Sequence, residues 1–122
     1  MPKTKLLIYQ DEDGTAPLLD WLEDMPDKAR AKCRVRLGRL AQLGHELRRP
    51  EADILRDGVY ELRVRLSGIN YRMLYFFHSN QAVLVTHGLT KEKRVPSKEI
   101  ELAIKRKRLF EADTVRHSRE LE

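Results

Sequence analysis

The sequence contains few of the residues that build metal sites and cofactor sites. Its 122 residues include a single cysteine, Cys33, which excludes an internal disulfide and a zinc site built from several cysteines. The four histidines show no i, i+4 pair: His45, His78, His87 and His117. No glycine-rich phosphate loop and no Gly-x-Ser-x-Gly motif occurs. We therefore expect no metal and no cofactor, which leaves charge and acid–base chemistry.

Long hydrophobic segments are also missing. No apolar run approaches the length of about 18 residues that a membrane-spanning helix needs, and no signal peptide is recognisable. Apolar residues make up 41% of the chain and charged residues 35%, as in a globular protein with a highly charged surface. We expect a cytoplasmic protein without membrane contact. A single domain over residues 1–112 should be followed by a frayed tail over residues 113–122.

The net charge of +5 is distributed unevenly along the chain. Residues 11–27 carry seven acids and no base, whereas residues 28–49 carry eight bases and one acid. Residues 91–110 carry eight bases and three acids. Two basic blocks of this kind attract polyanions such as nucleic acids. The alternative is that the basic helices have solvated faces and pair with the acidic segment.

Two helices are expected after an initial strand over residues 5–10. Thr15 is a suitable N-cap for the first helix, and apolar residues then recur at i, i+3, i+4 and i+7: Leu18, Trp21, Leu22 and Met25. Pro26 ends this helix and precedes a second helix over residues 27–43. A connection this short predicts an antiparallel helical hairpin, with the acidic first helix paired to the basic second. Trp21 should be largely buried between this hairpin and the sheet.

The central part of the chain has the pattern of strands. Strands are expected over residues 53–56, 59–66, 71–77 and 82–87, and a final helix runs from Pro96 to about residue 111. In the second of these strands, apolar residues alternate with charged ones, which places the two sets on opposite sheet faces. The predicted fold class is α+β. It has a curved antiparallel sheet, an N-terminal helical hairpin on one face and a C-terminal helix.

Cations gather on the expected charged face. Arg63 and Arg65 share one side of their strand, Arg72 lies on the next strand, and Lys91 and Lys93 follow the last strand. Guanidinium and ammonium groups arranged in this way suit a phosphodiester and stabilise extra negative charge in its transition state. RNA supplies its own nucleophile, the 2′-hydroxyl, so cleavage without a metal is chemically possible.

Two points stay open at this stage. The candidates for a general base are Glu61, His87 or a lysine with a lowered pKa. The arginines can equally serve structure alone, by pairing with Glu61, Asp53 or Asp57.

Three motifs together resemble a known family. Residues 55–63 read LRDGVYELR, residues 71–77 read YRMLYFF, and residues 87–93 read HGLTKEK, followed by Pro96. This combination is similar to the phage-derived, HigB-like toxins of the RelE/ParE superfamily. The resemblance covers about residues 5–110.

The resemblance implies a RelE-like fold and the toxin of a type II toxin–antitoxin pair. Such a toxin is a ribosome-dependent mRNA endonuclease that works without a metal and inhibits translation. By position, the implied catalytic residues are Arg63, Arg65, Arg72, Lys91 and Lys93, and we expect Arg94, Lys98 and Lys105 to bind RNA. The implied partners are the ribosome, mRNA and a cognate antitoxin, HigA-like with a helix-turn-helix domain.

The chain also departs from the RelE pattern. RelE has lysines where this chain has Glu61 and Arg63, and it has a tyrosine near its C-terminus, for which His117 is only a weak substitute here. The general base and acid are therefore unassigned. Two alternatives to the nuclease remain: a ParE-like toxin that poisons DNA gyrase, and an RNA-binding module without catalysis.

Overall fold

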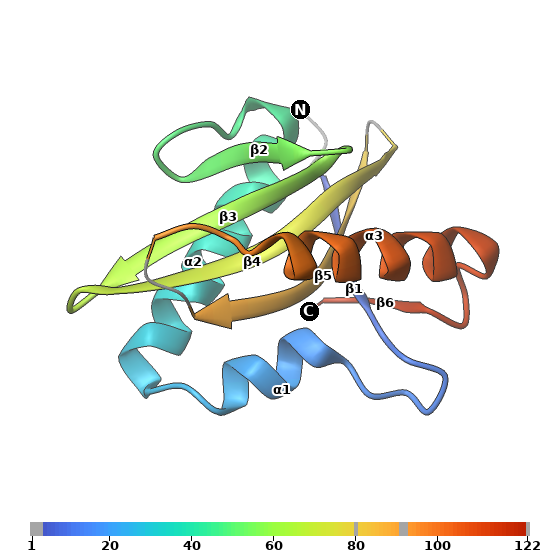
Figure 1. Cartoon of the computed structure of the whole chain (residues 1–122), viewed down its shortest axis with the longest axis horizontal. Helices are drawn as coiled ribbons and strands as arrows, with labels where there is room; N and C mark the ends of the chain where they lie inside the picture. The colour runs from blue at the N-terminus through green and yellow to red at the C-terminus, as the bar shows by residue number, and fades with distance from the viewer. Residues whose placement is uncertain (1–3, 80, 91–92, 122) are drawn as a thin grey trace.

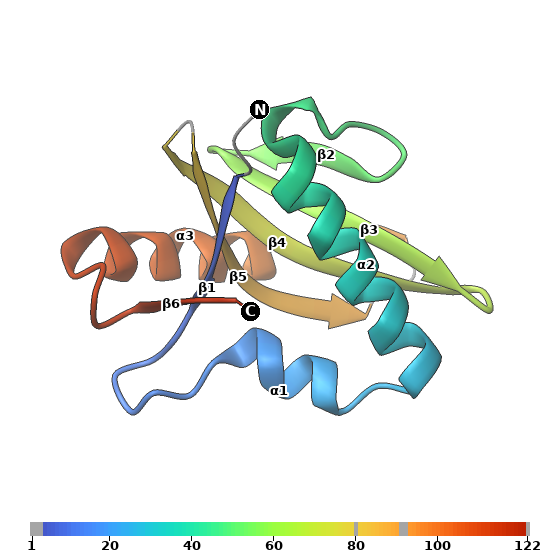
Figure 2. The same cartoon turned by 180° about the vertical axis from the view of Figure 1, so that it is seen from behind.

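The fold is a six-stranded sheet with helices on both faces (Figures 1 and 2). The computed structural model describes residues 4–79, 81–90 and 93–121. The elements are β1 (Lys5–Tyr9), α1 (Pro17–Glu23), α2 (Asp27–Leu43), the 3-10 helix η1 (Gly44–Glu46), β2 (Ala52–Arg56), β3 (Val59–Leu66), β4 (Ile69–Ser79), β5 (Ala82–Thr90), α3 (Ser97–Ala112) and β6 (Ser118–Glu120). The α+β class is confirmed.

The sheet has the order β2-β3-β4-β5-β1-β6 and is mixed. Strands β2 to β5 form the expected antiparallel meander, in which Leu62 lies opposite Met73. Strand β1, however, pairs parallel with β5, with Leu7 beside Leu84. The prediction of a wholly antiparallel sheet was wrong because α1 and α2 carry the chain across to the far edge. A crossover of this kind allows β1 to lie beside the last meander strand in the same direction.

The C-terminal segment is ordered, contrary to the expectation of a frayed tail. Strand β6 pairs antiparallel with β1, with Arg119 opposite Ile8. The His117 ring stacks on Tyr9 at a centroid distance of 5.6 Å, and its Nδ1 lies 3.0 Å from the carbonyl of Gln10. Without β6, the outer edge of β1 would present unpaired backbone groups, which the tail satisfies.

The two N-terminal helices cover one sheet face but do not form the expected antiparallel hairpin. Helix α1 packs along β5 and α2 crosses β3, so the pair forms a V in Figure 2. The N-cap of α1 is Ala16, followed by Pro17, and not Thr15. Arg30 donates to the carbonyls of Leu22, Glu23 and Met25, and not to acidic side chains of α1. The expected ion pairing between the two helices is absent from the interactions of the described residues.

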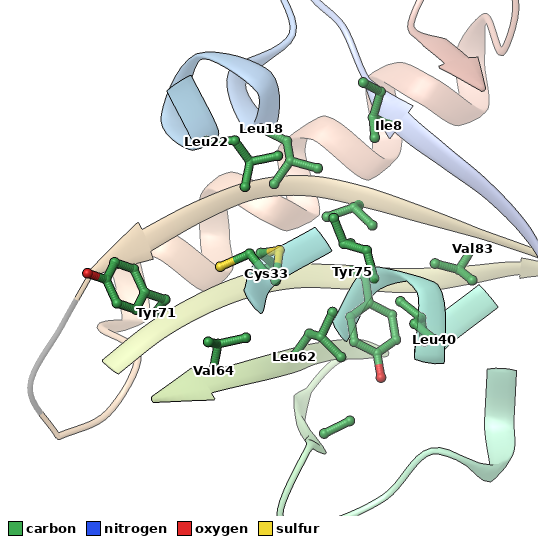
Figure 3. Close-up of a cluster of buried hydrophobic side chains, with 14 of the residues drawn as sticks. Ile8, Leu18, Leu22, Cys33, Leu40, Leu62, Val64, Tyr71, Tyr75 and Val83 are labelled. Carbon is green, nitrogen blue, oxygen red and sulfur yellow. The ribbon is translucent and has the colours of Figure 1, made fainter. Parts of the chain in front are cut away.

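The sheet face under α1 and α2 carries the main apolar core. Figure 3 shows part of it, including side chains of α1, α2 and the central strands: Leu18, Leu22, Cys33, Leu40, Leu62, Val64, Tyr71, Tyr75 and Val83. Trp21 is only half-buried. Its ring contacts Tyr71 edge-on and lies over Gly88, near the start of β4 and the end of β5. The expected deep burial of Trp21 is therefore not met.

Helix α3 covers part of the opposite face. Its Ile100 and Ala103 pack with Val59, Leu74 and Leu89. Farther along the helix, Phe110 contacts Phe76. Beyond these contacts lie the ends of β3 and β4 that carry the arginines, where Arg65 is exposed.

Candidate nucleic-acid interface

Five basic residues line one hollow at the edge of β3. The hollow has a volume of about 430 Å³ and is lined by cations from three elements: Lys32 and Arg36 of α2, Arg63 and Arg65 of β3, and Arg72 of β4. Among the described residues that line it, Glu51 is the one acid. We call this site the basic hollow. Its charge and size suit an anionic group such as a phosphate.

Helix α2 reaches this site because β2 covers only the first part of β3. The last backbone hydrogen bond between β3 and the segment before β2 is donated by the Arg63 nitrogen to the Glu51 carbonyl, 2.7 Å away. Beyond it, Arg36 donates to the Arg63 carbonyl, and Lys32 Nζ donates to the Arg65 carbonyl at 2.9 Å. The sequence analysis did not assign Lys32 and Arg36 to the site. Their i, i+4 spacing placed them on one side of α2, but it did not indicate which element that side meets.

Arg63 and Arg72 lie directly opposite each other on neighbouring strands. Like charges in this position are destabilising unless a counter-charge lies between them. Glu61 supplies it: its Oε2 is 3.1 Å from Arg63 Nη2, and its Oε1 is 3.4 Å from Arg72 Nη1. Glu61 is 3% exposed and Arg72 is 8% exposed, so both are desolvated. This pairing with Glu61 is the structural role that the sequence analysis left open.

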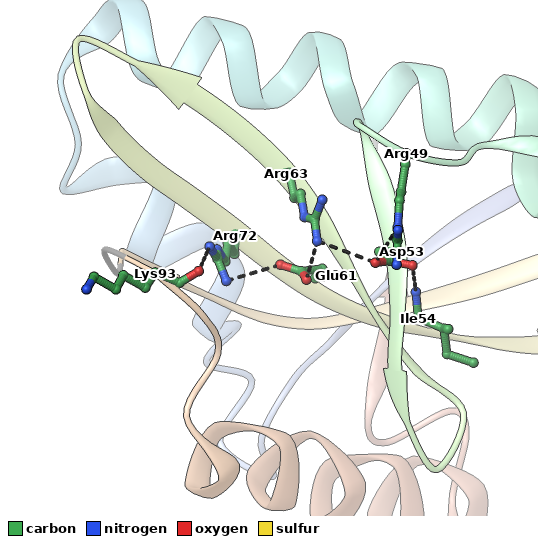
Figure 4. A network of polar contacts seen from close by, with 7 residues as sticks. All are labelled: Arg49, Asp53, Ile54, Glu61, Arg63, Arg72 and Lys93. Atoms are coloured by element: carbon green, nitrogen blue, oxygen red, sulfur yellow. Dashed lines mark hydrogen bonds and ion pairs between the residues drawn. The ribbon is translucent and has the colours of Figure 1, made fainter.

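The network continues on both sides of Glu61 (Figure 4). On one side, Asp53 Oδ2 is 3.5 Å from Arg63 Nη2 and accepts a hydrogen bond from Arg49 Nε at 2.8 Å. On the other, Arg72 Nη2 donates to the Lys93 carbonyl at 2.6 Å. The network therefore connects the start of β2 with the segment that precedes α3.

Two buried polar atoms of this network have no hydrogen bond among the described residues. They are Glu61 Oε1 and Arg63 Nε. The contact of Glu61 Oε1 with Arg72 is close enough for an ion pair, but it lacks hydrogen-bond geometry. Buried polar atoms without a hydrogen bond are rare in proteins, so these two atoms distinguish the network from the rest of the buried polar groups.

Two of the three remaining implied catalytic residues, Arg65 and Lys93, lie beside this network. Arg65 is exposed at the rim of the basic hollow, and its guanidinium has no ion pair within the described part of the chain. Lys93 contacts Arg72 through its backbone carbonyl, while its side chain points away in Figure 4. Lys91 lies outside the described residues.

The three expected RNA-binding residues are exposed but spread out. Arg94 directly follows Lys93, and Lys98 lies in the first turn of α3. Lys105 is seven residues further, about 10 Å along the helix axis. The segment before α3 is thus close to Arg72, whereas Lys105 extends away from it.

The candidate bases differ sharply in position. His87 is buried under α3, where its Nε2 lies 3.1 Å from Glu99 Oε1 and its Nδ1 lies 3.0 Å from Thr86 Oγ1. Burial, together with the nearby Arg106, lowers the pKa of His87 to about 4. His117 lies beside β1, with β5 between that strand and β4. Glu61 is therefore the candidate base that lies within the arginine network.

In the part of the chain that the structure describes, no three histidine, cysteine or acidic side chains gather where they could hold a metal ion. Within those residues, no helix is both long and apolar enough to cross a membrane.

A comparison with protein families identifies the family of this chain. Residues 20–108 match the profile of a family described as phage derived protein Gp49-like (DUF891). No curated protein matches the chain. The matched span includes every residue that lines the basic hollow, whereas β1 and β6 lie outside it.

Proposed function

The chain belongs to the Gp49-like family of phage-derived, toxin-like proteins within the RelE/ParE-like toxin superfamily, and from this premise we propose that it is an mRNA-cleaving toxin. In this proposal it is the toxin of a type II toxin–antitoxin pair, with a RelE-like fold related to HigB. It acts on mRNA at the ribosome and inhibits translation.

The observation that carries this proposal is the basic hollow. A phosphodiester needs donors that are already oriented before the reaction, because their reorganisation would otherwise add to the barrier. Glu61 holds Arg63 and Arg72 in fixed positions, and Arg65 adds an exposed guanidinium at the rim. A planar guanidinium group donates two parallel hydrogen bonds to two oxygens of one phosphate, which fixes the orientation of the phosphate.

The proposed reaction uses the RNA as its own nucleophile. The ribose 2′-oxygen attacks the adjacent phosphorus, the bond from phosphorus to the 5′-oxygen breaks, and a cyclic phosphate remains. We assign Glu61 to accept the 2′-hydroxyl proton, because its carboxylate lies within the arginine network, whereas His87 and His117 lie elsewhere. The arginines stabilise the charge that develops on the phosphate oxygens. The departing 5′-oxygen takes a proton from a group that we do not assign.

Induction of the protein in cells tests this proposal. We expect new mRNA 5′ ends at defined codon positions and unchanged supercoiling of a plasmid in the same cells. Intact mRNA together with gyrase-linked DNA breaks would favour the ParE-like alternative. RNA binding without cleavage would favour the module without catalysis.

The variant Arg65→Ala sharpens the test. The side chain is exposed and has no ion pair with any residue that the structure describes, so the substitution should change the free energy of unfolding by less than about 0.5 kcal/mol. Cleavage should fall roughly 100-fold or more, because a positive charge that stabilises the transition state is lost. Arg119→Ala is the matched control, since Arg119 is an exposed strand arginine on the distant β6. Equal cleavage by both variants would remove Arg65 from the site.

Salt dependence and the antitoxin provide two further readouts. Binding to RNA should weaken steeply as salt rises, because neutralised phosphates release counterions. The proposed antitoxin, HigA-like with a helix-turn-helix domain, should compete with RNA for the basic hollow by presenting acidic side chains. Binding of RNA that is insensitive to salt would show that another surface is used.

A further inference from the structure

A second hollow lies beside the basic hollow and has a different chemistry. It has a volume of about 550 Å³, and its lining combines rings, an exposed apolar side chain and cations: His45, Arg48, Arg49, Ile54 and Tyr60. Ile54 is 54% exposed, so it adds an accessible apolar side chain to this lining. We call this site the His45–Tyr60 hollow.

The two hollows are neighbours along the same edge of the sheet. Pro50 and Glu51 line the basic hollow, whereas Arg49 and Ala52, which flank them in the sequence, line the His45–Tyr60 hollow. Consecutive Cα atoms are only about 3.8 Å apart, so this short connector is the wall between the two sites. The network in Figure 4 crosses the same wall, because Asp53 contacts both Arg49 and Arg63.

Two aromatic rings of the His45–Tyr60 hollow each stack on another ring of the protein. The exposed His45 ring lies on Phe77, with a centroid distance of 3.5 Å and an interplanar angle of 15°. Tyr60 stacks on Tyr75 at 5.4 Å and 19°. An exposed ring that is covered on one face presents its other face to a further flat ring. Phe77 and Tyr75 fix the two rings in place, so little conformational entropy is lost when a third ring binds.

We propose that the His45–Tyr60 hollow binds an unpaired nucleobase of a single-stranded RNA whose neighbouring phosphate lies in the basic hollow. This inference rests on the proposed function in taking RNA as the ligand. Nucleobases stack on aromatic rings whatever their sequence, and Arg48 and Arg49 add cations for the adjoining backbone. A duplex hides its bases, so the geometry selects single-stranded RNA.

Binding of a labelled oligoribonucleotide to the full chain tests this inference. The probe is a single-stranded RNA of about six nucleotides, compared with the same RNA carrying one abasic position and with its duplex. Fluorescence anisotropy at low salt should show that His45→Ala lowers affinity for the intact RNA about 10-fold. His45→Phe should retain most of the affinity, because it keeps a flat ring.

The chain offers a matched control for this variant. His78 is also an exposed histidine in contact with a phenylalanine, Phe110, but it is outside both hollows. His78→Ala should leave affinity unchanged. Abasic RNA should bind wild type and His45→Ala equally when the missing base is the one that stacks. The salt dependence should be the same for wild type and His45→Ala, because no phosphate contact is removed.

Several results would overturn the inference. Absence of RNA binding at low salt, equal losses for all abasic positions, or equal affinity for the duplex would each do so. A His45→Ala protein that binds RNA normally but loses the antitoxin would assign the hollow to a protein partner. The proposed function can fail independently of this inference. Stacking on RNA without mRNA cleavage in cells would support the nucleobase site and exclude the nuclease. Cleavage of mRNA, together with unchanged RNA affinity of the His45→Ala protein, would support the nuclease and exclude the nucleobase site.

Discussion

The two faces of the central sheet use the same strands for different purposes. Side chains alternate along β4: Tyr71, Met73 and Tyr75 join the core under α1 and α2, whereas Arg72, Leu74 and Phe76 lie on the face of α3. The first face is one continuous apolar cluster. The second has two smaller apolar clusters, and it also carries the buried pairs of Glu61 with the arginines and of His87 with Glu99.

This difference separates stability from specialised chemistry. Buried apolar area stabilises a fold without directional demands, whereas buried ion pairs must offset the cost of desolvation with good geometry. The charged part of the second face therefore contributes less to the free energy of unfolding than apolar packing would. This charged part borders the basic hollow. Neighbouring residues such as Glu61 and Leu62 allow the two faces to be compared at one position in the fold.

The largest effect on stability should come from Leu62→Ala. Leu62 is fully buried under α2, so its loss removes transfer free energy and leaves a cavity. The free energy of unfolding should fall by about 3–5 kcal/mol, as measured by chemical denaturation. A loss below about 1 kcal/mol would show that the first face is loosely packed.

Substitution of the adjacent residue on the other face, Glu61→Gln, should cost about 3 kcal/mol. The shape is kept, but Arg63 and Arg72 then oppose each other with no negative charge between them. The double variant with Glu61→Leu and Arg72→Met should recover most of this loss while remaining unable to cleave RNA. Glu101→Gln, in an exposed pair with Arg56, is the control and should change stability by less than about 1 kcal/mol. A Glu61→Gln protein as stable as this control would contradict a structural role for the network.

A smaller effect is expected where β5 faces α1. A Cβ at Gly88 would overlap the Trp21 ring, so Gly88→Ala should destabilise the protein by about 1–3 kcal/mol. Gly38→Ala is the matched control, because a Cβ there meets nothing within 4 Å and alanine favours the helix. Adding Trp21→Leu should rescue Gly88→Ala. No rescue would mean that the strain lies in the backbone of β5.

The smallest effect is a pH dependence from His87, the neighbour of Gly88 on the other face. The pKa of His87 in the folded protein, about 4, lies below the ordinary histidine value of 6.5, so the unfolded chain binds more protons between these two values. The free energy of unfolding should therefore fall as the pH drops, by about 1 kcal/mol between pH 6 and pH 5. His87→Gln should remove this part of the pH dependence. An unchanged profile would assign the acid sensitivity to other groups.

Local pattern predicted much of this molecule correctly. Alternation in residues 61–66 assigned Glu61, Arg63 and Arg65 to one sheet face, and the structure confirms that arrangement. The helix over residues 27–43 was predicted with the observed bounds, since Pro26 and Gly44 delimit it. These features depend on backbone geometry over a few neighbouring residues, so the local sequence is enough to predict them.

Long-range arrangement was decided by packing. Nothing local distinguishes a parallel from an antiparallel neighbour for β1, and the short segment 118–120 becomes a strand only because β1 offers a free edge. The V of α1 and α2 follows from how each helix fits the twisted sheet, so the helix charges meet β3 and Glu51 and not each other.

The sequence by itself determined which residues carry charge, which strand faces they occupy and where the main helices begin and end. Only the tertiary structure decided that Lys32 and Arg36 join Arg63, Arg65 and Arg72 around one hollow. It also decided that Glu61 is buried between two arginines while His87 is enclosed under α3. The physical reason is that burial and charge pairing depend on distances between segments far apart in the chain, and those distances are set by the packing of whole helices on the sheet.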